Sequence, residues 1–290
     1  MPEDEPIPPA TEPCDPLAPN TRPAMVHDPA APSQRCELPE VERAIIESAV
    51  RESLKLPPDA PLDSAAWGRV EELYVQDDRI TSATAAWLAD PRSGLSALKI
   101  LGMQLDDTGA ALISHPDSAL KSLTVLDLVG GQIGDAGAAA LAHPRSPLKA
   151  LTHLYLGYTL ITDAGVAAMA RADSALSSLD ELKLNDTKVS DVGIIAMTQP
   201  DSGLRNLRWL DLWRSQIGDG AAAALASPTS SLRQLRGLDL EATNITDAGL
   251  KAFAHPDCGL KGLTDFCLND TRITDAAAKA VGKVVPSIRW

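Results

Sequence analysis

One repeated pattern constrains the fold of this chain more than any other feature of its sequence. The copy at residues 148–175 reads LKALTHLYLGYTLITDAGVAAMARADSA, and the copies follow the template LxxLxxLxLxxTxIxDAGxxALAxPxSx. Every copy spans 28 residues except the second, which has 25. The copies begin at Trp67, Leu95, Leu120, Leu148, Leu176, Leu204, Leu232 and Leu260. Because a unit of this length can bury its apolar face only against its neighbours, the repetition predicts a solenoid of eight stacked units.

Each unit predicts one strand followed by one short helix. In the fourth unit Leu154 and Leu156 alternate with other residues, which is the pattern of a half-buried strand. Thr162 then precedes DAGVAAMA and suits the N-cap of a helix, and the Asp of this string is expected to act as a helix-start charge. The glycine of the string, as at Gly165 and Gly249, is expected to let the helix approach the strand closely. A strand and a helix in constant order require parallel strands with helices outside them. The predicted fold class is therefore α/β, a horseshoe with parallel strands on the concave face and helices on the convex face.

The string LxxLxLxxTxIxDAGxxAL resembles the leucine-rich repeat, especially the long ribonuclease-inhibitor-like class and related bacterial arrays. The resemblance covers residues 67–290 and implies a leucine-rich-repeat solenoid, and the segment 39–56 resembles the N-terminal capping helix of bacterial members. The chain departs from the family by placing a hydroxyl residue where Asn or Cys is usual. These positions are Thr159, Thr187, Ser215, Thr243 and Thr271. A hydroxyl can still bond backbone groups in a turn, so the expected fold is unchanged.

Three regions follow from composition and pattern. The first 40 residues hold eleven of the 22 prolines and eight acidic residues against two arginines. This composition buries too little apolar surface to offset ordering, so residues 1–38 are expected to be disordered or loosely wrapped. Residues 39–66 are expected to form the capping helix and a linker. Residues 67–290 carry the eight repeats, and Ile288 would open a ninth unit without an obvious capping domain.

The bulk composition excludes several classes of partner. A formal net charge of −13 argues against nucleic acid, which needs a basic footprint, and favours a basic partner. No apolar run approaches the roughly 18–20 residues that a membrane span requires. The acidic, Pro-rich start is unlike a signal peptide. Since Met1 is also compatible with removal of a signal, the localisation stays open between envelope, secretion and cytoplasm.

No motif predicts catalysis, a metal or a cofactor. The sequence has no GxGxxG, phosphate loop, GxSxG or HExxH. The four cysteines lack zinc spacing, and Cys14 and Cys36 are compatible with either a disulfide or free thiols. His153 could be paired with Asp127 or Asp211 as acid and base, but an open sheet does not exclude water. We therefore expect a protein that is not an enzyme.

The concave face is expected to carry an unusual set of side chains. Residues between the buried strand leucines point into the hollow. They include all three tyrosines, two of the five tryptophans and ten carboxylates, against one Lys, one Arg and one His. Aromatics ringed by polar groups predict a binding patch. The predicted partner-binding residues are Asp127, His153, Tyr155, Tyr158, Trp209, Asp211, Trp213, Arg214, Asp239 and Glu241. Alternatively, large side chains on strands about 4.8 Å apart simply cover one another.

Two functions from different classes remain. The first is a non-enzymatic recognition module that binds a basic protein or peptide in the hollow. The second is a structural or surface array that self-associates through its C-terminal edge. The two hypotheses differ in whether the protein assembles as its concentration rises.

Overall fold

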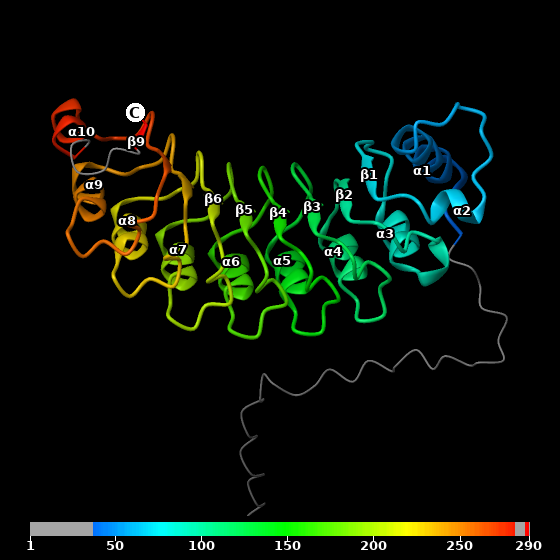
Figure 1. Cartoon of the computed structure of the whole chain (residues 1–290), viewed down its shortest axis with the longest axis horizontal. Coiled ribbons are helices and arrows are strands. Elements are labelled where there is room, and N and C mark those ends of the chain that lie inside the picture. The colour runs from blue at the N-terminus through cyan, green and yellow to red at the C-terminus, as the bar shows by residue number, and fades with distance from the viewer. Residues whose placement is uncertain (1–36, 282–287, 290) are drawn as a thin grey trace, which may run out of the picture. The chain divides into compact units, whose positions relative to one another are not determined.

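The computed structural model describes residues 37–281 and 288–289. Within this part, strand and helix alternate, and the strands form one parallel sheet in the order of the sequence, β1 to β9 (Figure 1). The strands are β1 Glu72–Val75, β2 Ile100–Met103, β3 Val125–Asp127, β4 His153–Tyr155, β5 Glu181–Lys183, β6 Trp209–Asp211, β7 Gly237–Asp239, β8 Asp265–Cys267 and β9 Ile288–Arg289. The solenoid expected from the repeats is thereby confirmed.

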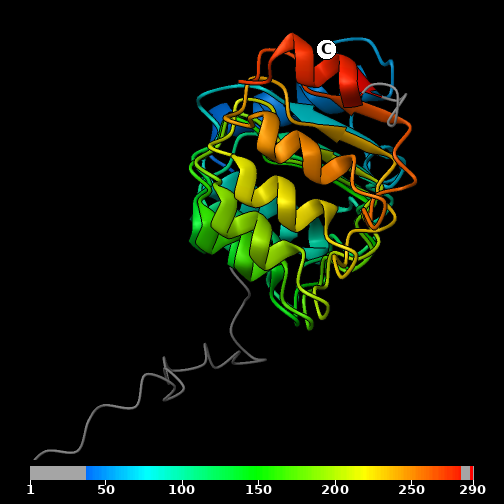
Figure 2. The ribbon, with the colours of Figure 1, turned by 90° about the vertical axis from the view of Figure 1, so that its left-hand side faces the viewer.

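The repeat helices α3 to α10 lie on the opposite side from the exposed sheet face and stack beside one another in chain order, whereas α1 and α2 precede this row (Figure 2). The helices are α1 Glu40–Ser53, α2 Ser64–Trp67, α3 Ser82–Ala89, α4 Asp107–Ile113, α5 Asp135–Ala142, α6 Asp163–Met169, α7 Asp191–Met197, α8 Asp219–Ala226, α9 Asp247–Phe253 and α10 Asp275–Val281, with a 3-10 turn at Pro91–Ser93. Ladders of fully buried leucines fill the space between sheet and helices. One such ladder runs through Leu126, Leu154, Leu182, Leu210 and Leu238, which occupy matching positions on neighbouring strands. The template leucines therefore form the core.

The N-terminal end of the sheet is covered by α1. Ile46 and Val50 are fully buried, and the Ser53 hydroxyl donates to the backbone carbonyl of Glu72 on β1 at 2.6 Å. Glu42 is buried as well, and its carboxylate accepts from the hydroxyls of Thr81 at 2.8 Å and Thr84 at 2.5 Å. A buried carboxylate is tolerated because these donors satisfy it. Apolar packing and this buried network together attach α1 to the first repeat.

The 25-residue second repeat stays in register with its neighbours. Leu101 of β2 pairs with Leu73 of β1 and with Leu126 of β3. The three missing residues fall in the turn after the strand: Asp107 follows Met103 by four positions in this repeat. The corresponding step in the third repeat, from Leu128 to Asp135, is seven positions. The shortening therefore removes turn residues and leaves the core positions in place.

The hydroxyl residues that replace the usual Asn bond the backbone, as expected. The Thr159, Thr187 and Thr243 hydroxyls each donate to the carbonyl three residues earlier at 2.6 Å. Ser215 instead donates at 3.2 Å to the carbonyl of Leu184 in the preceding repeat. These bonds satisfy buried turn carbonyls within each repeat and, at Ser215, across two repeats.

The aspartate at the start of helices α4 to α9 does more than act as the helix-start charge expected of it. Asp219 accepts from the Thr246 backbone at 2.8 Å, the Thr246 hydroxyl at 2.7 Å and the Gly249 backbone at 3.0 Å, all in the next repeat. A Cβ added at Gly249 would overlap the Asp219 carboxylate. The glycine thus makes room for the neighbouring repeat's aspartate, whereas the sequence suggested that it brings helix close to strand. We call this recurring contact the aspartate ladder.

The expected tail at residues 1–38 lies almost wholly outside the described residues, as do Cys14, Cys36 and Trp290. Leu38 is described and lies in the core. At the other end, β9 pairs with β8 in parallel, so Ile288 does open a ninth strand.

Candidate functional site

The strands present alternate residues to the sheet face away from the helices, here called the concave face. In β3 to β6 and β8 the central residue is buried and the two flanking residues are half-buried. The described residues predicted as binding residues all lie on or directly beside this face. Their contacts divide most of them into three groups, which differ in the ion pairs and ring contacts that their side chains already make within the chain.

The first group is a neutralised patch formed by His153, Tyr155, Glu181 and Lys183 on β4 and β5. The Lys183 ammonium lies 3.3 Å from the Glu181 carboxylate and 4.5 Å from the centre of the Tyr155 ring. The His153 Nε2 is 3.7 Å from the same carboxylate. Burial, followed by the Glu181 charge, raises the pKa of Tyr155 to about 12. Tyr155 therefore has partners within the chain already.

The second group is a rim cluster of Tyr158, Asp186, Trp213 and Arg214, just beyond the strand ends. Trp213 meets Tyr158 edge to face with ring centres 6.2 Å apart, and the Arg214 guanidinium lies 5.2 Å from the Trp213 ring. Arg214 also pairs with Asp186 at 3.3 Å. Tyr158 is 49% exposed, so a large apolar surface stays open to solvent beside a guanidinium.

The backbone of the rim cluster is left-handed. Tyr158, Asp186 and Arg214 have φ of 57°, 52° and 56°, and Gly130 has φ of 73° at the matching position of an earlier repeat. Positive φ costs a bulky residue free energy that glycine avoids. Tyrosine and arginine at these positions are thus locally unfavourable, a condition that is frequent at functional sites.

Trp209 behaves differently from Trp213. A Cβ added at Gly237 would overlap the six-membered ring of Trp209, so this ring lies across the neighbouring strand β7. Tyr74 covers Gly102 of β2 in the same way. Trp209 and Tyr74 thus each cover a glycine of the adjacent strand, whereas the alternative expected large side chains to cover one another. Trp213 has no glycine beneath it and contacts Tyr158 across the intervening repeat.

The third group is an acidic trio, Asp211, Asp239 and Glu241. The Asp211 carboxylate accepts from the Trp213 backbone at 3.0 Å, and that of Asp239 accepts from the Glu241 backbone at 2.9 Å. Within residues 37–281, no Lys or Arg forms an ion pair with any member of the trio. Burial raises the pKa of both aspartates, and neighbouring carboxylates raise it further. The trio is therefore half-buried negative charge that lacks a cation.

Asp127 is not part of the trio, although the sequence predicted all four residues to bind the same partner. The sheet register places Tyr155 and Lys183 between Asp127 and Asp211. The imagined acid–base pair also fails, because His153 contacts Thr152 at 2.9 Å and Glu181 rather than either aspartate. Distance along the sheet, which the composition of a face does not reveal, separates these residues.

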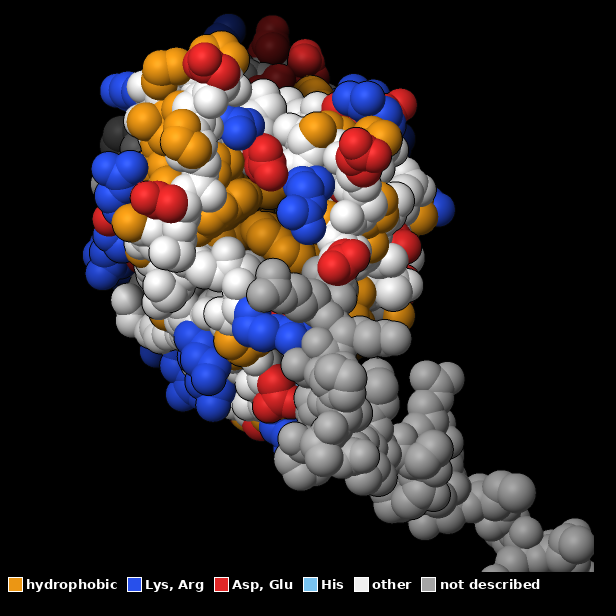
Figure 3. Space-filling model, turned by 90° about the vertical axis from the view of Figure 1, so that its right-hand side faces the viewer, with side chains coloured by type: hydrophobic (Ala, Val, Ile, Leu, Met, Phe, Trp, Pro, Cys, Tyr) orange, Lys and Arg blue, Asp and Glu red, His pale blue; other side chains and the backbone are white. Residues whose placement is uncertain are grey.

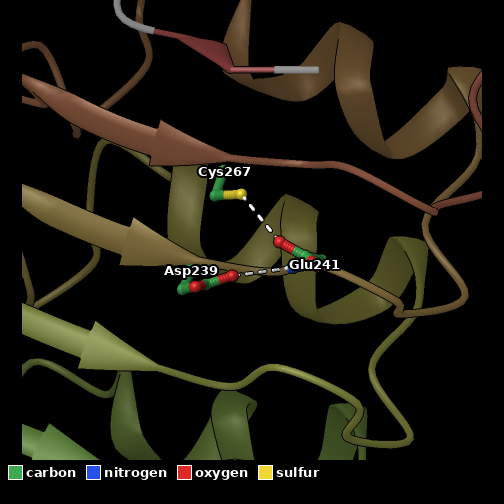
Figure 4. Close-up of side chains that lie close together, drawn as sticks. All are labelled: Asp239, Glu241 and Cys267. Atoms are coloured by element: carbon green, nitrogen blue, oxygen red, sulfur yellow. Dashed lines mark hydrogen bonds between the residues drawn. The ribbon is translucent and has the colours of Figure 1, made fainter.

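One cluster on this face could offer ligands to a cation. Ligand atoms of Asp239, Glu241 and Cys267 all lie within 4.8 Å of one another, and the Cys267 thiol donates to Glu241 at 3.3 Å (Figure 4). Burial and the two carboxylates raise the pKa of Cys267 to about 11, which keeps the sulfur protonated. Sequence spacing could not reveal this grouping, because the residues come from two repeats. Three such ligands without a fourth do not define a metal centre.

The hollows at the N-terminal end lie apart from Trp209 and Trp213. A cavity of about 670 Å³ runs between α1 and the end of β1 and is lined by Val41, Ile45, Tyr74 and Gln76 among others. Hydrophobic side chains gather in a depression of this end, between scattered charges (Figure 3). Sequence reasoning missed this groove, because its two walls are 30 residues apart in the chain.

Comparisons with known proteins agree with this geometry. A leucine-rich-repeat family model matches residues 119–142 and 232–254, in the third and seventh repeats. Internalin C2 of Listeria monocytogenes is 20% identical over 84% of this chain and 90% of its own, with a TM-score of 0.52. A leucine-rich-repeat protein of Leptospira interrogans is 18% identical over 73% of this chain and 51% of its own, with a TM-score of 0.41. No curated protein sequence matches.

The fold is that of a leucine-rich-repeat solenoid, and two of its repeats match the leucine-rich-repeat family model. The likeness to internalin C2 concerns the fold alone. No helix in the described ranges is long and apolar enough to cross a membrane.

Proposed function

We propose that this protein is a non-enzymatic recognition module that binds a basic protein or peptide on its concave face. The observation that carries the proposal is the rim cluster, in which Trp213 contacts both Tyr158 and Arg214. Tyr158 and Arg214 are exposed and have a left-handed backbone, and Trp213 is half-buried. Trp, Tyr and Arg are the residues that most often dominate the binding free energy of protein interfaces.

The geometry of the rim cluster suits it to contact a partner. The Tyr158 and Trp213 rings fix one another edge to face, and the Asp186 carboxylate fixes Arg214. Side chains that are ordered before binding lose little conformational entropy when a partner arrives. The cluster therefore offers apolar area and a guanidinium at low entropic cost.

Charge supports a basic partner. The neutralised patch leaves no net attraction at β4 and β5, whereas the acidic trio at β6 and β7 has no ion-paired Lys or Arg within residues 37–281. An acidic face next to an aromatic rim steers a basic partner toward it and disfavours acidic ones. The net charge of −13 acts in the same direction at longer range.

The open face does not favour catalysis. The Tyr, Asp and Cys side chains with raised pKa lie along the exposed sheet and not around a closed pocket; they are Tyr74, Tyr155, Asp211, Asp239 and Cys267. Burial is the first cause of each of these shifts. A reaction site needs groups that converge on one substrate atom and exclude water from it, so recognition accounts for this surface better.

The test is quantitative affinity capture from a lysate of the source organism. The double variant Tyr158→Ala/Trp213→Ala should retain the captured partner at least about tenfold less than the wild-type protein, since hot-spot residues contribute about 2 kcal/mol or more each. The control is Val192→Ala/Ile195→Ala on α7, which removes exposed apolar side chains from the helical side. Equal retention by all three proteins, with unchanged circular dichroism, would contradict the proposal.

Self-association is the second candidate, and one observation favours it. Among the described residues, β9 is the outermost strand of the sheet and pairs on one side, with Phe266 and Cys267 of β8. Such an edge can pair with another chain. Sedimentation velocity over a hundredfold concentration range separates the candidates: a constant coefficient supports recognition, and a rising one supports assembly.

A further inference from the structure

The ring of Trp209 forms a floor between two members of the acidic trio. It lies across β7 at Gly237, and Asp211 and Asp239 follow Trp209 and Gly237 by two residues on their strands. In the sheet register Asp211 pairs with Asp239, as Trp209 pairs with Gly237. Because side chains two residues apart in a strand share a face, both carboxylates stand beside the ring on the open side of the sheet.

The charge of the trio is not neutralised by an ion pair with any described Lys or Arg. Glu181, on the same face, is paired with Lys183 and His153. The charge of Lys183 also acts to lower the pKa of Asp211 from a distance. Within the described part of the sheet, however, Lys183 forms its ion pair with Glu181 and not with the trio. Several carboxylates that are partly removed from water repel one another and raise one another's pKa. This arrangement costs folding free energy that a bound cation would return.

We propose that Trp209, Asp211, Asp239 and Glu241 form the subsite for one arginine side chain of the basic partner. The inference rests on the proposed function and names the chemistry that this part of the face recognises. The arginine guanidinium stacks on the outer face of the Trp209 ring, and its edge donates to the carboxylates of Asp211 and Asp239. Glu241 adds negative charge at the end next to β8.

Arginine fits this subsite better than lysine for two reasons. A guanidinium is planar, so it can stack on an indole while its N–H groups stay in the plane to bond two carboxylates. Charge-assisted bonds that are paired in this way are among the strongest in proteins. The lysine ammonium is a compact, strongly hydrated charge that cannot stack, so it would satisfy the carboxylates and leave the ring unused.

Isothermal titration at low ionic strength tests the subsite with three acetylated and amidated peptides, Gly-Arg-Gly-Arg-Gly and its lysine and citrulline counterparts. We expect the arginine peptide to bind about fivefold or more tightly than the lysine peptide, and the uncharged citrulline peptide not to bind measurably. The double variant Asp211→Asn/Asp239→Asn should lose about tenfold in affinity for the arginine peptide. Asparagine keeps an oxygen for the backbone bonds, so the strand ends should stay folded.

A charge-matched control separates the subsite from general attraction. Asp201→Asn/Asp257→Asn removes the same two charges from exposed turns away from the concave face and should retain affinity within about twofold. Equal losses in both variants, or equal affinity for the arginine and lysine peptides, would overturn the inference.

The capture experiment distinguishes this failure from failure of the proposed function. If the Asp211/Asp239 variant still holds the captured partner while the Tyr158/Trp213 variant loses it, the subsite is wrong and the recognition face stands. If both variants hold the partner as tightly as the wild type, both proposals fall. Loss by both variants, with the control unchanged, supports both.

Discussion

At the scale of single residues, one turn position has a left-handed backbone in several repeats. Glycine at this position favours stability, whereas Tyr158 and Arg214 make contacts there. Ala242 has φ of 54° at the position occupied by Gly130, Tyr158 and Arg214 in other repeats. Alanine has no advantage over glycine in the folded turn, because its left-handed backbone costs about 1 kcal/mol. Glycine avoids this cost but offsets part of the benefit, because it loses more conformational entropy on folding. Ala242→Gly should therefore raise the free energy of unfolding by up to about 1 kcal/mol in urea titrations.

Gly130→Ala provides the opposite change at the same position of the third repeat. Its φ is 73°, and an added Cβ would lie 3.2 Å from the Gln104 side chain. We expect this variant to lower the free energy of unfolding by about 1 kcal/mol. A loss of stability in Ala242→Gly would contradict the view that backbone conformation decides whether glycine or alanine is more stable at these positions.

The residue scale also shows what the sequence could not predict. Strand alternation placed Trp209 and Trp213 on the concave face, because the buried leucines around them fix the register. Their different roles depend on the neighbouring repeats. Trp209 lies on Gly237, and Trp213 reaches Tyr158 two repeats away. These contacts join residues 28 and 55 positions apart, so no local pattern contains them.

At the scale of elements, the aspartate ladder ties each helix to the next. Burial alone would raise the pKa of Asp219, but hydrogen bonds from Thr246 and Gly249 outweigh it and lower the pKa below its ordinary value. Asp219→Ala would leave these buried donors without an acceptor. We expect a loss of about 2–3 kcal/mol in the free energy of unfolding at pH 7, measured in urea.

The lowered pKa fixes the sign of the pH dependence. The ionised Asp219 contributes its full stability above the ordinary aspartate pKa of about 4, and this contribution is lost as the pH falls through the lower folded-state pKa. The difference between wild type and Asp219→Ala should therefore shrink below about pH 4. Asp275→Ala is the control, since Asp275 begins α10 and is exposed. A difference that stays constant down to pH 2 would contradict the ladder's electrostatic part.

The elements themselves were predictable from sequence, because one template repeats. Strand, turn and helix recur with the leucines and the DAG string, and the structure follows that order through β8 and α10. The helix at residues 39–56 ends earlier than expected, at Ser53, two residues before Lys55 takes φ of 54°. The Gly249 position was misjudged, because the aspartate it accommodates belongs to another repeat.

At the scale of the whole described array, the concave face divides along its length. The neutralised patch on β4 and β5 separates Asp127 from the acidic trio on β6 and β7, with the rim cluster beside them. The sequence predicts that all of these charges form one acidic face. The register of the sheet shows instead that the acidic trio and the rim cluster lie close together, around β4 to β7, so a partner should dock there.

Site-specific photocrosslinking tests this central claim most directly. A benzophenone side chain at Glu241 or Val129 reports on the two halves of the concave face, and one at Val192 reports on the helical side. With the captured partner present, we predict strong crosslinking from position 241, less from position 129 and none from position 192. Crosslinking from position 192 alone would show that the partner binds the helical side and would contradict the account.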